Sequence, residues 1–411
     1  MSIEIRPATA PEMGQLGLMG AYSYAGAFGD GPDNVVATGT RPEWTLCAFD
    51  TAVRQADGQP TMATSFSAFP FTTRVNGNAV PLAGISTVGT RPEYRRQGLV
   101  RKIMTQAFAD QYQRGQCLAG LWASQAAIYQ RYGFAASGGL REYRIDTTDI
   151  HLHQDVAAMP VLRFEGTDAL DAVREVYKQF IVARTGYLHR GKSLWLDNVL
   201  APPPDDGPAY VAVVGSLEAP TGYLVYTLRA GRVAHRARAQ EICIRDFAWL
   251  DLASYASLWH YLGRHDLVGR VVWGRAPVDD PAPDLFVEPR LLHTQDLEGT
   301  WWRVVDAQSA LMLRGYDVEG SLVLAIADDE LAPWNNGRWH LDAGPQGAEV
   351  RATTAAADIE LSVRALSSLY SGNRSAQQLA NAGLLAGAPD TLVKLDQIMR
   401  ARYAPHCPDH Y

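Results

Sequence analysis

Arg95, Arg96 and Gly98 form a pattern suited to holding a phosphate group. They follow Leu82–Val88, whose small and β-branched residues predict a buried strand. From Leu99 onward, apolar residues recur every three or four positions, which predicts an amphipathic helix. The first N–H groups of such a helix favour an anion, the arginines add charged donors, and Gly98 lets the backbone come close. The segment predicts a pyrophosphate-binding turn, with an arginine-rich, solvated helix start as the alternative.

A tyrosine after a second predicted strand could serve as an acid. The strand covers Cys117–Trp122, and Tyr129 opens the sequence Tyr-Gln-Arg-Tyr-Gly-Phe that ends at Phe134. In a reaction that releases a thiolate, a phenol could protonate the thiolate as it leaves. This would help at neutral pH, because a thiol has an ordinary pKa of about 8.5. We expect Tyr132 or Phe134 to pack in the core, and packing remains the alternative for Tyr129.

Both segments resemble the GNAT superfamily of acetyltransferases. Arg95, Gly98 and Val100 occupy the slots of its Arg/Gln-x-x-Gly-x-Gly/Ala motif, although Val100 departs from the small residue usual at the last slot. Tyr129 to Phe134 resembles the Tyr-x-x-x-Gly-Phe segment of the superfamily. The resemblance implies that acetyl-CoA is the acetyl donor and that Tyr129 is the acid.

Four segments together resemble the enhanced intracellular survival (Eis) family of acetyltransferases across nearly the full length. They are Thr90–Leu99, Ala123–Phe134, Arg275–Pro281 and Ala332–Trp339. Membership implies two tandem GNAT-like domains of α/β type followed by an α+β domain that resembles sterol carrier protein. It also implies a hexamer and direct transfer of an acetyl group to amines, including aminoglycosides or related polyamines.

The resemblance also assigns the site residues. The family's cofactor contacts map onto Val88, Thr90, Arg95, Arg96, Gly98, Leu99 and Ser124. Its general base is a terminal carboxylate, which Tyr411 carries in this sequence. Such a group has an ordinary pKa of about 3.3–3.7, so it needs desolvation or a bridging water to act as a base. A frayed end, the usual state of a terminus, is the alternative.

The order of predicted elements divides the chain into three units. Residues 1–145 form the first unit, which holds the acetyl-CoA site and ends in a strand at Arg141–Ile145. Residues 146–292 again alternate strands and helices but contain no comparable arginine-glycine turn, so we expect a GNAT-like domain without a coenzyme site. Residues 293–411 combine strands with three helical stripes, an α+β pattern.

Composition excludes several classes of protein. The 411 residues can bury a large core, and a net charge of -7 argues against binding to nucleic acid. The four cysteines are scattered, and the histidines have no metal-ligand spacing, so we expect neither disulfides nor a metal. Apolar runs are too short to span a membrane and the N-terminus lacks a secretory segment, so we expect a soluble, cytoplasmic protein.

One motif invites a wrong interpretation. Residues Gly186 to Ser193 match the P-loop pattern G-x-x-x-x-G-K-[ST]. A P-loop needs a strand before it and small residues within it. Here a helical stripe over Leu170–Ile181 precedes a bulky, basic loop, so we expect a polar lining near a substrate or subunit contact instead.

The acceptor side is less determined. Aromatic and acidic residues in a glycine-rich stretch could wall a cleft for polyamines, or could form an ordinary surface loop; they are Tyr22, Tyr24, Phe28, Asp30 and Asp33. A peptide lysine therefore remains a possible acceptor. A second class of function is a non-catalytic protein that binds acyl-CoA or lipid. It is disfavoured because Tyr129 occupies the tyrosine position of the superfamily's Tyr-x-x-x-Gly-Phe segment.

Overall fold

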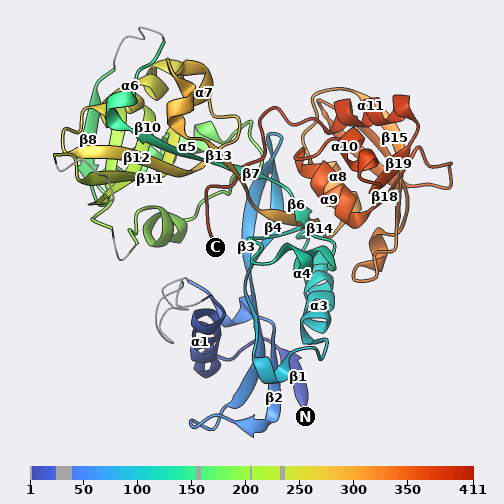
Figure 1. The fold of residues 1–411 in the computed structure, drawn as a ribbon. Coiled ribbons are helices and arrows are strands. Elements are labelled where there is room, and N and C mark those ends of the chain that lie inside the picture. The colour runs from blue at the N-terminus through green and yellow to red at the C-terminus, as the bar shows by residue number, and fades with distance from the viewer. Residues whose placement is uncertain (1, 25–38, 154–158, 204–205, 232–236) are drawn as a thin grey trace.

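The computed structural model describes residues 2–24, 39–153, 159–203, 206–231 and 237–411. Three β-sheets, each covered by helices, form three units (Figure 1). The first two sheets have seven strands each and the third has five. No helix within the described ranges is both long and apolar enough to cross a membrane.

The first sheet has the order β1-β2-β3-β4-β5-β14-β6. Its strands are β1 (Ile3–Arg6), β2 (Cys47–Arg54), β3 (Pro60–Val75), β4 (Asn78–Thr90), β5 (Leu118–Leu121), β6 (Ala135–Ala136) and β14 (Trp301–Val304), and its helices are α1 (Met13–Ser23), α3 (Leu99–Gln113) and α4 (Ala126–Gln130). The predicted strand, turn and helix around Gly98 are thus confirmed as β4 and α3. Asn76 and Gly77 join β3 to β4 with φ of 46° and 100°, as a tight hairpin turn requires.

The second sheet has the order β13-β7-β12-β11-β10-β9-β8. Its strands are β7 (Gly139–Asp146), β8 (Val161–Glu165), β9 (Tyr210–Gly215), β10 (Pro220–Ala230), β11 (Gln240–Trp249), β12 (Val268–Ala276) and β13 (Gln295–Glu298), and its helices are α5 (Leu170–Phe180), α6 (Leu252–Gly263) and α7 (Ala282–Leu285). The helical stripe expected before the P-loop-like segment is confirmed as α5.

Three strands, β7, β13 and β14, cross the expected unit boundaries in a way that the sequence did not indicate. The strand predicted at Arg141–Ile145 exists as β7, but it pairs with β12 and β13 in the second sheet rather than closing the first. β14, whose residues were expected in the third unit, pairs with β5 and β6 in the first sheet. Alternating apolar residues predict a strand without naming its partner, so only tertiary packing decides the sheet; Tyr143 and Ile145 are buried in the second core.

The third sheet has the order β17-β16-β15-β18-β19. Its strands are β15 (Gly320–Ala327), β16 (Gly337–Gly344), β17 (Gly347–Ala352), β18 (Ile359–Ser362) and β19 (Leu385–Gly387), and its helices are α8 (Ala307–Leu313), α9 (Val363–Ser371), α10 (Ala376–Asn381) and α11 (Pro389–Met399). One apolar core joins this unit to the first, because Leu82 and Trp302 of the first sheet cluster with Leu324 of the third. After α11 the chain returns to the space between the first two units (Figure 1).

Candidate active site

A cavity of about 1460 Å³ lies where the first two units and the C-terminal segment meet. The first unit contributes the end of β4 and the residues after β5. The second unit contributes the P-loop-like segment and the cavity-facing side of β11 and β12, and the C-terminal segment contributes Pro408–Tyr411. Among the site residues expected from the sequence, the lining includes Val88, Ser124, Tyr129 and Tyr411.

The cavity begins where β4 and β5 part. Their parallel pairing covers only Leu82–Gly84 with Leu118–Gly120, while β4 continues to Thr90. The register between β3 and β4 also shifts between Ser65 and Ser67, which marks a β-bulge opposite them. Thus the parted strands leave room for a ligand between them.

A side chain of β3 fixes the bulge. Thr87 has a φ of 51°, an unusual value for a β-branched residue. The Ser65 hydroxyl donates to the Thr87 carbonyl at 2.6 Å and accepts from the Gly89 N–H at 3.1 Å. These two bonds hold Val88, whose neighbours are fixed on both sides, at the wall of the cavity.

The expected phosphate turn follows Val88 in the chain, but none of its residues from Thr90 to Leu99 lines the cavity. Tyr94 anchors it, because its buried hydroxyl donates to Asp50 at 3.2 Å. Arg95, whose Nε donates to the Thr90 carbonyl at 3.2 Å, is exposed, as are Arg96 and Gly98. Gly98 has a φ of 74° and an added Cβ would meet nothing within 4 Å, so conformation rather than space favours glycine. Leu99 buries its side chain and can offer a ligand only its backbone.

Tyr129 lies inside the cavity wall on the short helix α4. Only 4% of it is exposed, and burial raises its pKa well above the ordinary value of a phenol. A hydrogen bond with Ser124 opposes this shift without reversing it. The phenol is therefore neutral and can donate a proton. Phe134 is fully buried and packs edge-on against Tyr129, as expected for a core residue, whereas Tyr132 is half-buried.

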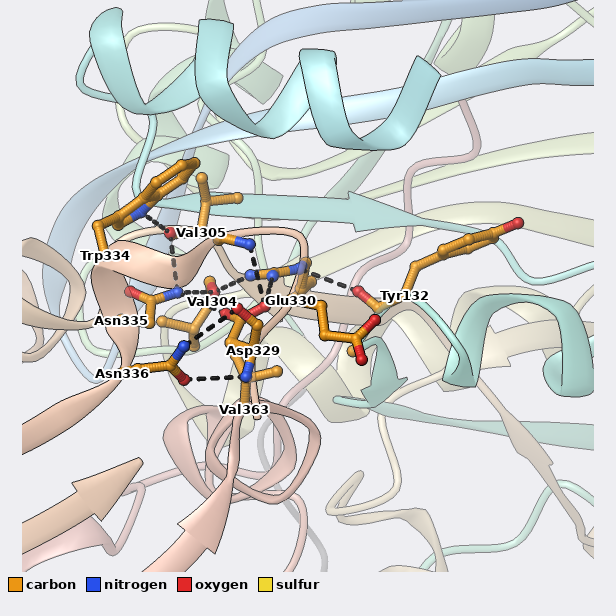
Figure 2. A network of polar contacts seen from close by, with 12 residues as sticks. Tyr132, Val304, Val305, Asp329, Glu330, Trp334, Asn335, Asn336 and Val363 are labelled. Atoms are coloured by element: carbon orange, nitrogen blue, oxygen red, sulfur yellow. Dashed lines mark hydrogen bonds and ion pairs between the residues drawn. The ribbon is translucent and has the colours of Figure 1, made fainter. Parts of the chain in front are cut away.

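The third unit supports the turn that follows α4. Arg303 of β14 is fully buried, and its Nε donates to the Tyr132 carbonyl at 2.9 Å. Its Nη2 donates to Asp329 at 2.6 Å, and Asp329 also accepts from the Asn335 amide at 2.9 Å (Figure 2). The segment Ala332–Trp339, one of the four that carry the family resemblance, is thus part of a polar network that joins the first and third units.

The C-terminal segment ends against two paired glycines of the first sheet. Gly84 of β4 and Gly120 of β5 are direct partners across the parallel pair. Tyr411 covers them: its ring carbon would lie 3.1 Å from a Cβ at Gly84, and its hydroxyl 3.1 Å from a Cβ at Gly120. A Cβ at Gly84 would also lie only 2.4 Å from the Phe71 ring, and one at Gly120 only 3.0 Å from the Trp302 ring, so larger residues at these positions would disturb the packing around Tyr411. The packed terminus is therefore not frayed.

The P-loop-like segment holds this tail in place. Gly186, with a φ of 94°, lets the backbone approach His406; an added Cβ would lie 2.5 Å from the His406 carbonyl oxygen. Arg190, which is buried, pairs with Asp246 and with Asp409, the latter at 2.8 Å. The expectation of a polar lining is confirmed, since the segment also borders the cavity. Burial lowers the pKa of His406 to about 4, so this residue is neutral near pH 7.

The residues expected to wall a cleft for the acceptor have three different outcomes. Tyr24 lines the cavity, and its hydroxyl donates to the Val88 carbonyl at 3.4 Å, while Tyr22 is exposed. Phe28, Asp30 and Asp33 lie outside the described residues.

The arginines at 190 and 303 were missed as functional groups, because their partners are 219 and 26 residues away in sequence. Within the described part of the chain, no cluster of three or more potential metal ligands occurs.

Family models match all three units. Models of the GNAT acetyltransferase domain match residues 4–137 and 186–314, and a model of the sterol carrier protein domain matches residues 307–408. These matches confirm the fold class of two GNAT domains followed by a domain like sterol carrier protein.

Known proteins resemble the chain over most of its length. An uncharacterized N-acetyltransferase of Streptomyces coelicolor is 30% identical over 87% of this chain and 88% of its own. The N-acetyltransferase Eis of Mycobacterium tuberculosis is 28% identical over 77% of each chain. The crystal structure of Eis1 from Mycobacterium abscessus shares the fold, with a TM-score of 0.83, 23% identity and full coverage of both chains.

Proposed function

This chain belongs to the Eis family of GNAT N-acetyltransferases, and we propose that it transfers an acetyl group from acetyl-CoA directly to an amine in a ternary complex. The observation that carries the proposal is the convergence of Val88, Ser124, Tyr129 and Tyr411 on one cavity. Acetyl-CoA supplies the acetyl group as a thioester.

We assign the donor site to the first unit. The turn from Thr90 to Leu99 offers the exposed side chains of Arg95 and Arg96 and the N-terminus of a fifteen-residue helix, a suitable environment for a pyrophosphate. Val88 and Ser124 border the part of the cavity nearest Tyr129. A backbone N–H near Val88 would then stabilise negative charge on the thioester oxygen.

Tyr129 and Tyr411 divide the proton transfers. The amine must lose a proton as it attacks, and the terminal carboxylate of Tyr411 accepts it, directly or through water. The thiolate leaves as the carbon–sulfur bond breaks, and the neutral phenol of Tyr129 donates a proton to it. No covalent intermediate with the protein forms in this scheme.

The family resemblance supports aminoglycosides or related polyamines as acceptors, and a peptide lysine is the second candidate. From the same resemblance we propose a hexamer. We also keep three units, with the donor site confined to the first, although β7, β13 and β14 cross the boundaries expected at residues 145 and 292. The rival function, binding of acyl-CoA or lipid without catalysis, predicts no turnover.

Thiol release from acetyl-CoA in the presence of a panel of amines tests the proposal. We expect release with at least one amine, and a loss of roughly 10²–10⁴-fold in kcat for Tyr129→Phe with acetyl-CoA affinity unchanged. One residue appended after Tyr411 should lower kcat in the same way. Binding of acetyl-CoA without release for any amine would favour the binding protein, and an unaffected Tyr129→Phe would reassign the acid.

A further inference from the structure

Four arginines of the second unit line the cavity, and they fall into two pairs. Arg190 and Arg229 are neutralised: Arg190 pairs with Asp246 and Asp409, and Arg229 pairs with Glu241. The other two are Arg245 on β11 and Arg275 at the end of β12.

Arg245 and Arg275 hydrogen-bond to carbonyl groups only. Arg245 donates to the carbonyl oxygens of Val199 and Ala201 at 2.9 and 2.6 Å. Arg275 donates to the Pro408 carbonyl at 3.2 Å. Within the described ranges of the chain, no carboxylate forms an ion pair with either arginine, although both are half-buried.

Two such cations close together need a counter-charge. Their strands are parallel neighbours, with Ile244 opposite Trp273. Burial first, and the charge of Arg275 next, lower the pKa of Arg245, while Asp206 and Asp246 oppose this shift. Partial burial of a guanidinium without an ion-pair partner is costly, even with Asp206, Asp246 and Asp409 near enough to act on these two. A guanidinium binds a carboxylate or phosphate in two-pronged geometry. An anion from the ligand would supply the missing charge.

The position of Arg275 points to the acceptor rather than to the donor. Its guanidinium carbon lies 6.0 Å from the centre of the Trp122 ring. Trp122 stacks on His410 at 5.3 Å and donates to the Asp409 carbonyl at 3.0 Å, so Arg275 adjoins the tail that places Tyr411.

We propose that the acceptor carries, besides its amine, an anionic group, a carboxylate or a phosphate, which binds Arg275 with Arg245 beside it. This inference rests on the proposed function and narrows its acceptor. Amino acids, peptides and phosphorylated amines have such a group. Of the acceptors proposed above, the inference therefore favours a peptide amine over the polycationic aminoglycosides, which have no anionic group for Arg275.

Matched acceptors test the inference. Amino acids with a terminal amine and chains of two to six carbons are compared with their primary amides, which have nearly the same shape and no charge. Aminoalkyl phosphates are compared with the corresponding amino alcohols. We expect a preference for the anion of about tenfold or more in kcat/KM, as a charge-assisted pair provides. The series with the larger preference distinguishes carboxylate from phosphate.

Variants assign that preference to its residues. Arg275→Gln should abolish it while leaving acetyl-CoA affinity unchanged, and Arg275→Lys should keep part of it. Arg229→Gln is the matched control, since this cavity arginine already has a carboxylate partner. Equal rates for anion and amide at every length, or a preference that survives Arg275→Gln, would overturn the inference. Calorimetry of the same pairs on the CoA complex gives the answer even if no amine is acetylated, a result that would count against the proposed function alone.

Discussion

Tyr411 packs its ring edge-on against Phe71, with the ring centroids 4.9 Å apart and the planes at 70°. Phe71 belongs to β3, so the end of the chain is fixed against the first sheet rather than exposed to solvent. The relationship explains how a tail that follows the third unit can place Tyr411 at a cavity between the other two.

The hydroxyl of Tyr411 gives the first prediction. It is buried and has no hydrogen-bond partner among the described residues, so no hydrogen bond offsets the free-energy cost of its desolvation. Tyr411→Phe keeps the ring and the terminal carboxylate, and we expect the free energy of unfolding to rise by about 1 kcal/mol. Turnover should stay unchanged. Denaturant unfolding checks the first and thiol release the second; a clear loss of stability would mean that the hydroxyl has a partner.

Arg190 gives the second prediction. It is the cation that neutralises Asp246 and Asp409, and the Tyr223 hydroxyl also donates to Asp246, at 2.6 Å. Arg190→Met would leave two buried carboxylates unpaired, which should cost about 3 kcal/mol or more. The tail would then loosen, so kcat should fall and hydrogen exchange of residues 405–411 should accelerate.

Lys192→Ala is the matched control for Arg190. Lys192 lies in the same P-loop-like segment and is exposed. If the segment held a nucleotide phosphate, its lysine would matter most; if it holds the tail, Arg190 matters and Lys192 does not. A strong effect of Lys192→Ala with none for Arg190→Met would restore the P-loop interpretation.

Local patterns predicted what local forces determine. The strand over Leu82–Val88 and the helix from Leu99 follow from residue type and apolar spacing, and both are present. The family resemblance also led to the site residues, of which Val88, Ser124, Tyr129 and Tyr411 meet at one cavity. Their roles remain proposals.

Long-range pairing was beyond such patterns. Tertiary packing decides which sheets β7 and β14 join. The apolar alternation of Arg141–Ile145 predicts a strand but does not specify its sheet. Arg190 could be expected only to belong to a polar lining, because its partner Asp409 is 219 residues away in sequence. The bulge at Thr87 was equally hidden, since β-branched residues rarely adopt a positive φ.

Arg303 gives the third prediction, on the coupling between the third unit and Tyr129. Arg303→Met removes the bond to the Tyr132 carbonyl, three residues after Tyr129, and leaves Asp329 buried without its cation. We expect a loss of about 3 kcal/mol or more in stability and a lower kcat with an unchanged KM for acetyl-CoA.

Two further variants separate this positioning role from a merely structural one. The double variant Arg303→Met, Asp329→Asn removes the orphaned charge, so much of the stability should return while kcat stays low. Arg131→Ala, an exposed arginine of the same turn, is the matched control. Recovery of kcat together with stability in the double variant would contradict a positioning role for Arg303.

Asp280 gives the fourth prediction, on the pH dependence of stability. It is buried in the second unit, where it accepts from the Tyr255 hydroxyl at 2.7 Å and from the Ala282 N–H at 3.0 Å. Burial raises its pKa to about 7, against an ordinary value of about 3.9 in the unfolded chain. The folded state therefore binds the proton more tightly, and this contribution to stability is complete below about pH 4 and lost as the pH rises to about 7.

Asp280→Asn should remove that dependence, because the amide does not titrate. Measured by denaturant unfolding from pH 4 to 8, the stability of the wild type minus that of the variant should fall with pH, by up to about 1.4 kcal/mol per unit, and level off above about pH 7. Asp279→Asn, an exposed carboxylate in the same turn, controls for the loss of a charge. A difference that rises with pH would mean that Asp280 is ionised in the folded protein and pairs with a cation.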